Sequence, residues 1–598
     1  MAEESVDRGI GRRAFGAGLL VLGGALMAGS TPVAGAASGH RGGRPTLRRG
    51  SARRAGLLAE HLDRLVTDAE EFLAPSPAHP WYAGAVLLAG RGGTVALHRA
   101  IGTAVRYAAY DERTDTGVEL PADRRIAMSE DTVFDLASVS KLFTSVLAVQ
   151  QIERGSLEPE ERVTAYLPGF GVGGKRDVTV RHLLTHTSGL PAWLPLYEEP
   201  TPEAMLRRVA DEPLTRPPGT AYLYSDLNLI SLQSVLEAVT GRRLDALLHE
   251  EVTVPLGMDR TRYNPPPSWR PGIAATEDCR RPWSGLDRGM VWGEVHDENA
   301  YALGGVAGHA GVFSRAWDLA VLARTLLNGG AYGSARILSP ESVELMFTDF
   351  NPGFPDDAHG LGLELGQRWY MGAMATPRTA GHTGFTGTSL VLDPGTDTFL
   401  VLLGNSVHPV RRWRAGSAPR VAAANHLARA VAVRPARGRT AWFAGMESDV
   451  SATLTLPPLT AHAGPAPGPV RLRCALWWDT EPTADAAFLE VSRDGGTTWE
   501  PLPFTTVRPG QQPRTRPAGS VSGWSGRVWH EATADLSAHG TGGVRLRWRY
   551  TTDRRLVGRG VYVDGLRVLD ATGSPLFDDS RPADASRVEA AGWTRSAD

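Results

Sequence analysis

The chain of 598 residues contains very little lysine and very little cysteine. Only two of its 63 lysine and arginine residues are lysine, Lys141 and Lys175, so arginine carries almost all of the positive charge. Cys279 and Cys474 are the only cysteines and fall in different predicted domains, which excludes a disulfide framework. The formal net charge is −2, so no basic excess points to a nucleic-acid partner.

Two common catalytic signatures are also missing. There is no G-x-S-x-G pentapeptide, which argues against an α/β-hydrolase, and no H-E-x-x-H helix to hold a zinc ion. The segment Val295-His296-Asp297-Glu298-Asn299, with His309 nearby, has side chains that suit zinc. We expect it to form a hydrogen-bonded rim of a site instead, with no metal and no cofactor.

The first 37 residues predict an export signal. The twin-arginine pair Arg12-Arg13 precedes a Gly- and Ala-rich apolar run over residues 16–29, and Ala34-Gly35-Ala36 is a cleavage site of small residues. The short, glycine-rich run disfavours a retained membrane anchor, and no cysteine follows it to carry a lipid. We expect twin-arginine export to an extracellular or cell-wall location, with no membrane contact in the mature form.

Changes in composition divide the rest of the chain. Residues 38–55 are rich in Arg, Gly and Ser and predict a flexible spacer, and 434–441 predict a linker between domains. In the domain 56–433, strands at both ends bracket a helical middle, which predicts an α+β fold whose first and last segments share one antiparallel sheet. In 442–598, short alternating strands and turns predict an all-β sandwich or jelly roll.

Particular stretches of the first domain have clear periodicity. Apolar spacing predicts an amphipathic helix over about 56–72 and a final helix near 418–433. The predicted strands are 84–89, 94–98, 362–366, 388–393 and 398–404.

One of the two lysines lies beside a serine. In Ser138-Val139-Ser140-Lys141, just ahead of an apolar helical run, the spacing puts the hydroxyl and the amine on one helix face. The unpaired N–H groups and dipole of the helix start favour a developing oxyanion there. A hydroxyl is a weak nucleophile that needs an adjacent base, and the candidates are Lys141 and Tyr224. Lys175, in a glycine-rich loop, is predicted to be a solvated surface charge.

Three ordered motifs give a specific resemblance. The series S-x-x-K at Ser138, Y-S-D at Tyr224 and H-T-G at His382 resembles the class C β-lactamase, DD-peptidase and esterase family of serine hydrolases. The stretches around His186 and His309 resemble that family too, and His186 is interpreted as shaping a loop. The resemblance covers about residues 80–432.

The resemblance implies a role for each motif residue. Ser138 is the acylated nucleophile, and Lys141 and Tyr224 share its deprotonation and the reprotonation of the leaving group. The oxyanion hole is formed by the backbone N–H groups of Ser138 and Phe385. The residues that line and orient the substrate are His382, Thr383, Gly384 and Asp226.

Two departures from the family pattern affect the expected substrate. Asp226 stands where β-lactamases of this class have asparagine, and a carboxylate cannot donate the amide hydrogen bond. His382 replaces the usual lysine, which makes positive charge near a substrate carboxylate dependent on pH. Both changes favour a peptidase, amidase or esterase over an efficient β-lactamase.

The second domain resembles the jelly-roll domain that trails some secreted metallopeptidases. Trp477-Trp478-Asp479 and Val561-Tyr562-Val563-Asp564 carry this resemblance, which implies adhesion or substrate targeting. Its many tryptophans either pack in a core or form a sugar platform. Asp479 and Asp564 either bind structural Ca²⁺ or lie in surface turns.

Together these patterns predict an exported serine hydrolase that forms an acyl-serine intermediate on an amide or ester. The first substrate expected is a peptide ending in D-Ala-D-Ala, including peptidoglycan, and the second is a small carboxyl ester. A non-catalytic protein that binds cell wall or glycan on the same scaffold, through its C-terminal domain, is the alternative of a different class.

Overall fold

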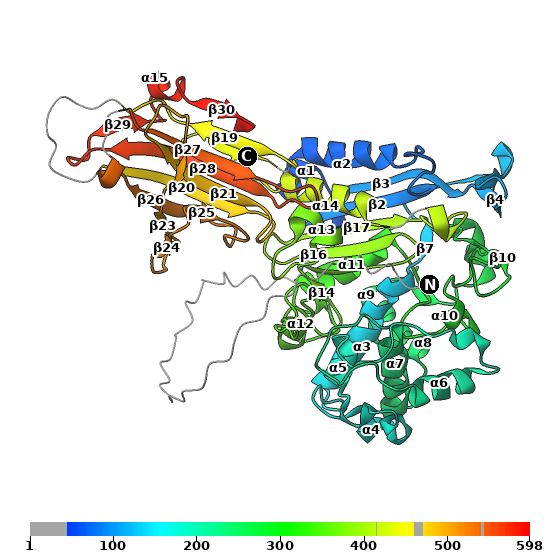
Figure 1. Cartoon of the computed structure of the whole chain (residues 1–598). Coiled ribbons are helices and arrows are strands. Elements are labelled where there is room, and N and C mark those ends of the chain that lie inside the picture. Colours follow the sequence, from blue (N-terminus) through cyan, green and yellow to red (C-terminus); the bar gives the residue numbers. More distant parts are fainter. Residues whose placement is uncertain (1–44, 414–415, 446, 460–469, 540–542) are drawn as a thin grey trace, which may run out of the picture.

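The computed structural model describes residues 45–413, 416–445, 447–459, 470–539 and 543–598. The predicted export signal and residues 38–44 of the predicted spacer lie outside these ranges. A mixed α/β domain is followed by an all-β region (Figure 1), which confirms the predicted fold class. No helix in the described ranges is long and apolar enough to cross a membrane.

The first domain is built on one sheet with the strand order β1-β3-β2-β17-β16-β15-β14. Strand β2 pairs antiparallel with β17, so early and late segments of the chain meet at the centre of the sheet, as predicted. Both strands are apolar and buried along almost their whole length, because helices cover both faces. The strands are β1 (Arg48–Arg49), β2 (Gly84–Arg91), β3 (Thr94–Val105), β14 (Glu364–Leu365), β15 (Ala380–Thr383), β16 (Thr388–Asp393) and β17 (Thr398–Gly404).

Two helices cover one face of this sheet and two lie in the core on the other side. The side chains of α2 (Ala59–Glu71) and α14 (Ala418–Ala430) share one apolar core with the sheet. The opposite core contains α11 (Ala316–Leu327) and α3 (Ser140–Glu153). Helix α3 is buried on all sides from Ser140 to Gln151, its polar side chains included. Its first turn is therefore held rigidly at the sheet.

Residues 45–55 correct the prediction of a flexible spacer. β1 pairs in parallel with β3, Leu47 is buried, and Ser51 caps a short helix, α1 (Ala52–Ala55). The Arg- and Ser-rich composition concealed one apolar anchor and one capping hydroxyl, and these two features are enough to order the segment.

Lys175 is not the solvated charge that the sequence predicted. Its side chain is fully buried, and its ammonium donates to the carbonyl of Glu212 and lies 5.5 Å from the centroid of the Phe170 ring. Burial lowers the pKa of Lys175. Gly173 and Gly174, both at positive φ, fold the loop over the amine, a conformation that favours glycine.

The second domain consists of two sheets that share one apolar core. The larger has the order β24-β23-β26-β20-β28-β18-β31, and the smaller β22-β21-β27-β19-β30. Tryptophans such as Trp548 and Trp593 pack in the core between them. The strands are β18 (Ala441–Ala444), β19 (Ser451–Thr455), β20 (Arg471–Asp479), β21 (Ala486–Ser492), β22 (Glu500–Pro501), β23 (Phe504–Val507), β24 (Arg514–Arg516), β26 (His530–Asp535), β27 (Arg545–Thr551), β28 (Gly560–Leu569), β30 (Glu589–Ala591) and β31 (Trp593–Ser596).

Arginines join the two domains. Arg527 of the second domain donates to Asp393 of the first, at 2.5 Å, and to Asp479, at 3.2 Å. Arg559 donates to backbone carbonyls at the end of α14. Asp479 is thus a buried partner of arginine at the domain contact and not a residue of a surface turn. Asp564 is also buried, where it accepts a hydrogen bond from the backbone N–H of Arg437.

A buried histidine fastens β3 to a distant loop. The Nε2 atom of His408 accepts hydrogen bonds from the backbone N–H groups of Arg106 and Tyr107, both at 3.0 Å, and its Nδ1–H donates to the carbonyl of Thr276. Burial lowers the pKa of His408 to about 3, because a proton on Nε2 would be buried without an acceptor. The neutral ring therefore holds these segments together.

We predict that this histidine makes the fold sensitive to acid. The unfolded chain takes up the proton near pH 6.5 and the folded chain only near pH 3, so stability is fully present above pH 6.5 and is lost as the pH falls. His408 should contribute a loss of about 2 kcal/mol between pH 7 and pH 5. The His408→Asn variant should be less stable than the wild type at pH 7. Urea unfolding should show that the difference in their free energies of unfolding is smaller at pH 5. If this difference were the same at both pH values, His408 would not be the source of the acid sensitivity.

Candidate active site

Ser138 lies in a 3₁₀ turn (Ala137–Val139) directly before α3. Ala137 has a φ of 47°, in the left-handed region that residues with a side chain seldom adopt. The carboxylate of Asp135 holds this turn by accepting the N–H of Ala137 at 2.9 Å. A backbone strained next to a nucleophile and fixed by its neighbours is typical of a functional site.

The amine of Lys141 forms two hydrogen bonds and one ion pair. It lies 2.8 Å from Oγ of Ser138, 2.7 Å from Oδ1 of Asp226 and 3.1 Å from the carbonyl oxygen of His309. The side chain of Lys141 is only 2% exposed, so water cannot replace these partners. The structure brings together Ser138, Lys141 and Asp226, and it gives Asp226 a partner that the sequence analysis did not foresee.

Tyr224 belongs to the same group of side chains. It precedes α7 (Asp226–Thr240), whose first residue is the carboxylate that pairs with Lys141. The amine of Lys141 lies 4.9 Å from the centroid of the Tyr224 ring, and the ring of His186 lies 4.6 Å away. His186 accepts the N–H of Ser225 at 3.1 Å. The histidine interpreted as shaping a loop therefore also contacts the predicted catalytic tyrosine.

The H-T-G segment is fastened to the chain just ahead of Ser138. The hydroxyls of Thr386 and Thr388 donate to the carbonyls of Asp135 and Leu136, at 2.8 and 2.9 Å. A Cβ atom at Gly384 would lie 2.3 Å from the carbonyl oxygen of Leu136, so only glycine permits this approach. The backbone of Phe385, proposed for the oxyanion hole, is thus tied through its neighbours to the nucleophile segment.

His382 carries no charge near neutral pH. Its Nδ1–H donates to the carbonyl of Thr383 at 2.7 Å, which leaves Nε2 as a buried acceptor. Burial and the nearby charge of Lys141 lower the pKa of His382 to about 3. The ring therefore stays neutral near pH 7, where the usual lysine would be positive, and gains a charge only in acid.

Asp297 and His309 lie beside Lys141, as expected for the hydrogen-bonded rim that the sequence predicted. Nε2 of His309 lies 2.9 Å from Oδ1 of Asp297, and the carbonyl of His309 accepts from Lys141. Burial alone would raise the pKa of Asp297. The charge and hydrogen bond of His309 nevertheless hold this pKa well below its usual range. Both belong to segments noted in the sequence, but only the fold brings them to Lys141.

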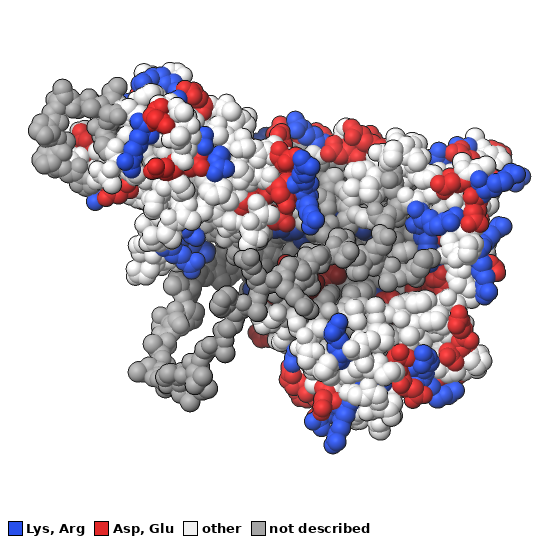
Figure 2. Space-filling model, viewed as in Figure 1, with Lys and Arg blue, Asp and Glu red and all other residues white. Residues whose placement is uncertain are grey.

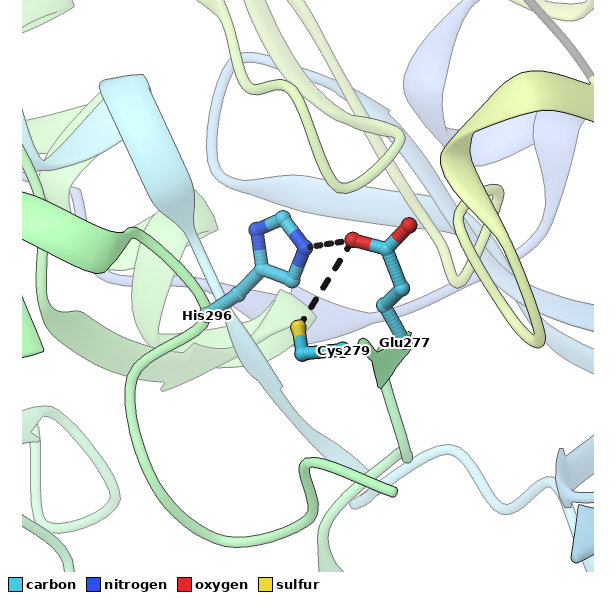
Figure 3. A group of neighbouring side chains, drawn as sticks. All are labelled: Glu277, Cys279 and His296. Carbon is cyan, nitrogen blue, oxygen red and sulfur yellow. Dashed lines mark hydrogen bonds and ion pairs between the residues drawn. The ribbon is translucent and has the colours of Figure 1, made fainter. Parts of the chain in front are cut away.

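A group of metal-ligand types does lie behind Phe385. Figure 3 shows Glu277, Cys279 and His296 pointing toward one another. Their potential ligand atoms all lie within 4.8 Å of one another. Burial alone would lower the pKa of His296, but hydrogen bonds to Cys279 and Glu277 raise this pKa to about 10. Arg411 donates to the Glu277 carboxylate at 2.7 Å, so a cation already neutralises this ligand.

These contacts support a structural role for the group. The ring of His296 stacks on that of Phe385 with 5.7 Å between centroids, and the backbone N–H of His296 donates to Asp135 at 2.6 Å. One buried cluster thus supports both Phe385 and the strained turn before Ser138. Ligand atoms of Asp226, Asp297 and His309 also lie within 4.8 Å of one another. The carboxylate of Asp226, however, already forms an ion pair with the amine of Lys141.

Comparisons with known proteins bear on the family of the chain. A family model described as Beta-lactamase matches residues 63–425, and one described as Immune inhibitor A-like, MAM domain, matches residues 419–598. A putative D-alanyl-D-alanine carboxypeptidase of Escherichia coli K12 is 33% identical over 396 residues, covering 61% of this chain and 86% of that protein.

Two solved structures are also similar. EstCE1, a hydrolase with promiscuous acyltransferase activity, is 23% identical, covers 62% of this chain and 98% of its own, and has a TM-score of 0.48. A family VIII carboxylesterase is 20% identical with the same coverage and a TM-score of 0.47. With the family model spanning more than half of its length, the chain belongs to the β-lactamase family and is a serine hydrolase.

Proposed function

We propose that this chain is an exported DD-peptidase-like enzyme that hydrolyses peptides ending in D-Ala-D-Ala through an acyl-serine intermediate. The observation that carries the proposal is the line of contacts from Asp226 through Lys141 to Ser138, at 2.7 and 2.8 Å. A carboxylate that orients a base, which in turn contacts a hydroxyl, is the arrangement that activates a serine nucleophile.

Acylation then follows from these contacts. Oγ of Ser138 attacks the substrate carbonyl and gives its proton to Lys141, while Lys141 gives one of its protons to Asp226. The amine keeps its charge throughout, and the negative charge moves from Asp226 to the substrate oxygen. The N–H groups of Ser138 and Phe385 stabilise that oxyanion. As the bond to the leaving group breaks, the Tyr224 hydroxyl gives its proton to that group, and the proton held by Asp226 returns through Lys141 to Tyr224. Water then attacks the acyl carbon, and its proton passes through the same groups to Oγ of Ser138, which leaves as its bond to the acyl carbon breaks.

A peptide carboxylate needs a cation, and we propose that Arg420 supplies it. Lys141 is already engaged in two hydrogen bonds and one ion pair, and His382 is neutral. Arg420, on α14, donates to the carbonyl of Gly384 at 2.8 Å and so lies at the H-T-G edge. Guanidinium groups bind carboxylates through paired hydrogen bonds. The name of the Escherichia coli relative supports the same substrate class.

A small carboxyl ester is the second candidate substrate. The neutral ring of His382 favours it, because a site without fixed charge at this position does not demand a substrate carboxylate. Both substrates use the same acyl-serine chemistry, so the difference lies in recognition alone.

Location and targeting complete the proposal. The twin-arginine pair at Arg12-Arg13 supports export to the cell wall or beyond, where D-Ala-D-Ala peptides of peptidoglycan are found. The C-terminal all-β domain would hold the enzyme on a glycan close to that substrate.

Lys141→Arg should abolish acylation while the fold remains. Arginine keeps the positive charge but does not give up its proton, so the rate of labelling by a fluorophosphonate should fall by about 10²- to 10⁴-fold. Lys175→Arg, the same change at the other lysine, is the matched control and should be labelled normally. Intact-protein mass spectrometry measures the label, and circular dichroism checks the fold. Full labelling of the Lys141→Arg variant would exclude lysine as the base.

Arg420→Gln should separate the two substrate classes. Losing one charge-assisted contact should raise KM for an acyl-D-Ala-D-Ala peptide by about tenfold. The KM for p-nitrophenyl acetate, which has no carboxylate, should stay unchanged. If the wild type cleaves only the ester, the peptidase proposal fails and the esterase proposal stands. If the variant loses both activities equally, Arg420 has a structural role.

A further inference from the structure

The second domain contains a pocket that is lined only by residues of that domain. It has a volume of about 160 Å³ and lies among the edge strands of the larger sheet and the loop at 524–526. The side chains that carry the argument are Trp478, Trp524, Arg508, Arg514, Arg516 and His530.

Strand register explains why two of the arginines enter the pocket. On the edge strand β24, Arg514 lies opposite Thr506 and Arg516 opposite Phe504, and these partners on β23 are buried. Residues directly opposite in an antiparallel pair point to the same face. Arg514 and Arg516 therefore extend over the inner face of the sheet, at an edge that strand pairing leaves open.

Positive charge in this pocket is not balanced. Among the described residues, no carboxylate forms an ion pair with Arg508, Arg514 or Arg516. In Figure 2 the blue atoms near the end of β24 have white neighbours. Burial lowers the pKa of His530, and the charges of all three arginines act in the same direction. Burial and the charge of Arg514 likewise lower the pKa of Arg516.

The pocket also holds polar atoms that have no partner. Nε1 of Trp478 and Oγ of Ser525 are buried, and no hydrogen-bond partner lies near either in the described part of the chain. The guanidinium of Arg516 stacks on the Trp478 ring, 5.5 Å from its centroid, and is thereby fixed in direction. An oxyanion would satisfy both the donors and the charges.

An exposed aromatic ring at the rim indicates what carries the oxyanion. Trp524 is 41% exposed, although a large apolar side chain is more stable when buried. Indole rings offer a flat apolar face with a polar edge, which suits the C–H face of a sugar ring. The pocket is smaller than the roughly 300–1,000 Å³ of sites for drug-sized ligands, so it admits one acidic sugar unit of a longer chain.

We propose that this pocket binds an acidic polysaccharide through the carboxylate of one sugar unit. Arg514 and Arg516 hold the carboxylate, Arg508 adds charge, and Trp524 stacks on the ring of the same or the next sugar. The site is independent of Ser138, so it serves to position the enzyme and takes no part in acylation.

The test uses the full chain and three soluble probes. Isothermal titration calorimetry should detect binding of a polygalacturonate oligosaccharide and no binding of its fully methyl-esterified form. Inorganic phosphate should bind at least tenfold more weakly than the acidic sugar. The double variant Arg514→Glu/Arg516→Glu should lose at least about tenfold in affinity for polygalacturonate, since two charge-assisted contacts are reversed.

A matched control lies on the opposite face of the same sheet. Arg473, exposed on β20, has no carboxylate partner in the described ranges, so Arg473→Glu makes the same charge change outside the pocket. The Arg473→Glu variant should keep wild-type affinity for polygalacturonate. The Trp524→Ala variant should bind the oligosaccharide more weakly but bind phosphate as the wild type does. All variants should hydrolyse p-nitrophenyl acetate as the wild type does, or all should be equally inactive if the proposed catalysis fails. The proposal would be overturned if the esterified probe or phosphate bound as tightly as polygalacturonate. It would also be overturned if the double variant kept wild-type affinity for polygalacturonate.

Discussion

The ion pair between Lys141 and Asp226 is the contact on which the rest of the site depends. A buried ammonium is costly unless it is paired and hydrogen-bonded, and here a carboxylate provides the ion pair while a hydroxyl and a backbone carbonyl accept hydrogen bonds. Two of these partners come from different helices and the third from the loop at His309. The sequence predicts a lysine beside Ser138, but only the packing of α3 against α7 brings Asp226 to that lysine.

The rest of the first domain keeps these partners in register. The central strands β2 and β17 fix the sheet, and the buried helix α3 presents its first turn at the edge. Threonine hydroxyls tie the H-T-G edge to the same turn, and the cluster of Glu277 and His296 supports it from behind. Precision at Ser138 therefore comes from several rigid elements, as catalysis by positioned groups requires.

Sequence reasoning located the motifs and the fold class but not the interactions that define each residue. The antiparallel sheet and the contact of Ser138 with Lys141 follow from local periodicity and spacing, so both were predicted. Asp226 seemed only to lack an amide donor, because its partner is distant in the chain. The neutrality of His382 and the burial of Lys175 depend on tertiary packing, and composition concealed the order of residues 45–55.

Asp226→Asn gives the most direct test of the central claim that the carboxylate takes part in activating Ser138. Asparagine keeps the size of the side chain but neither carries negative charge nor takes a proton. With p-nitrophenyl acetate, kcat should fall by about a hundredfold or more while KM changes by less than about threefold. A variant that is equally active or faster would contradict the account, since Asp226 would then do no more than fill the place of an amide.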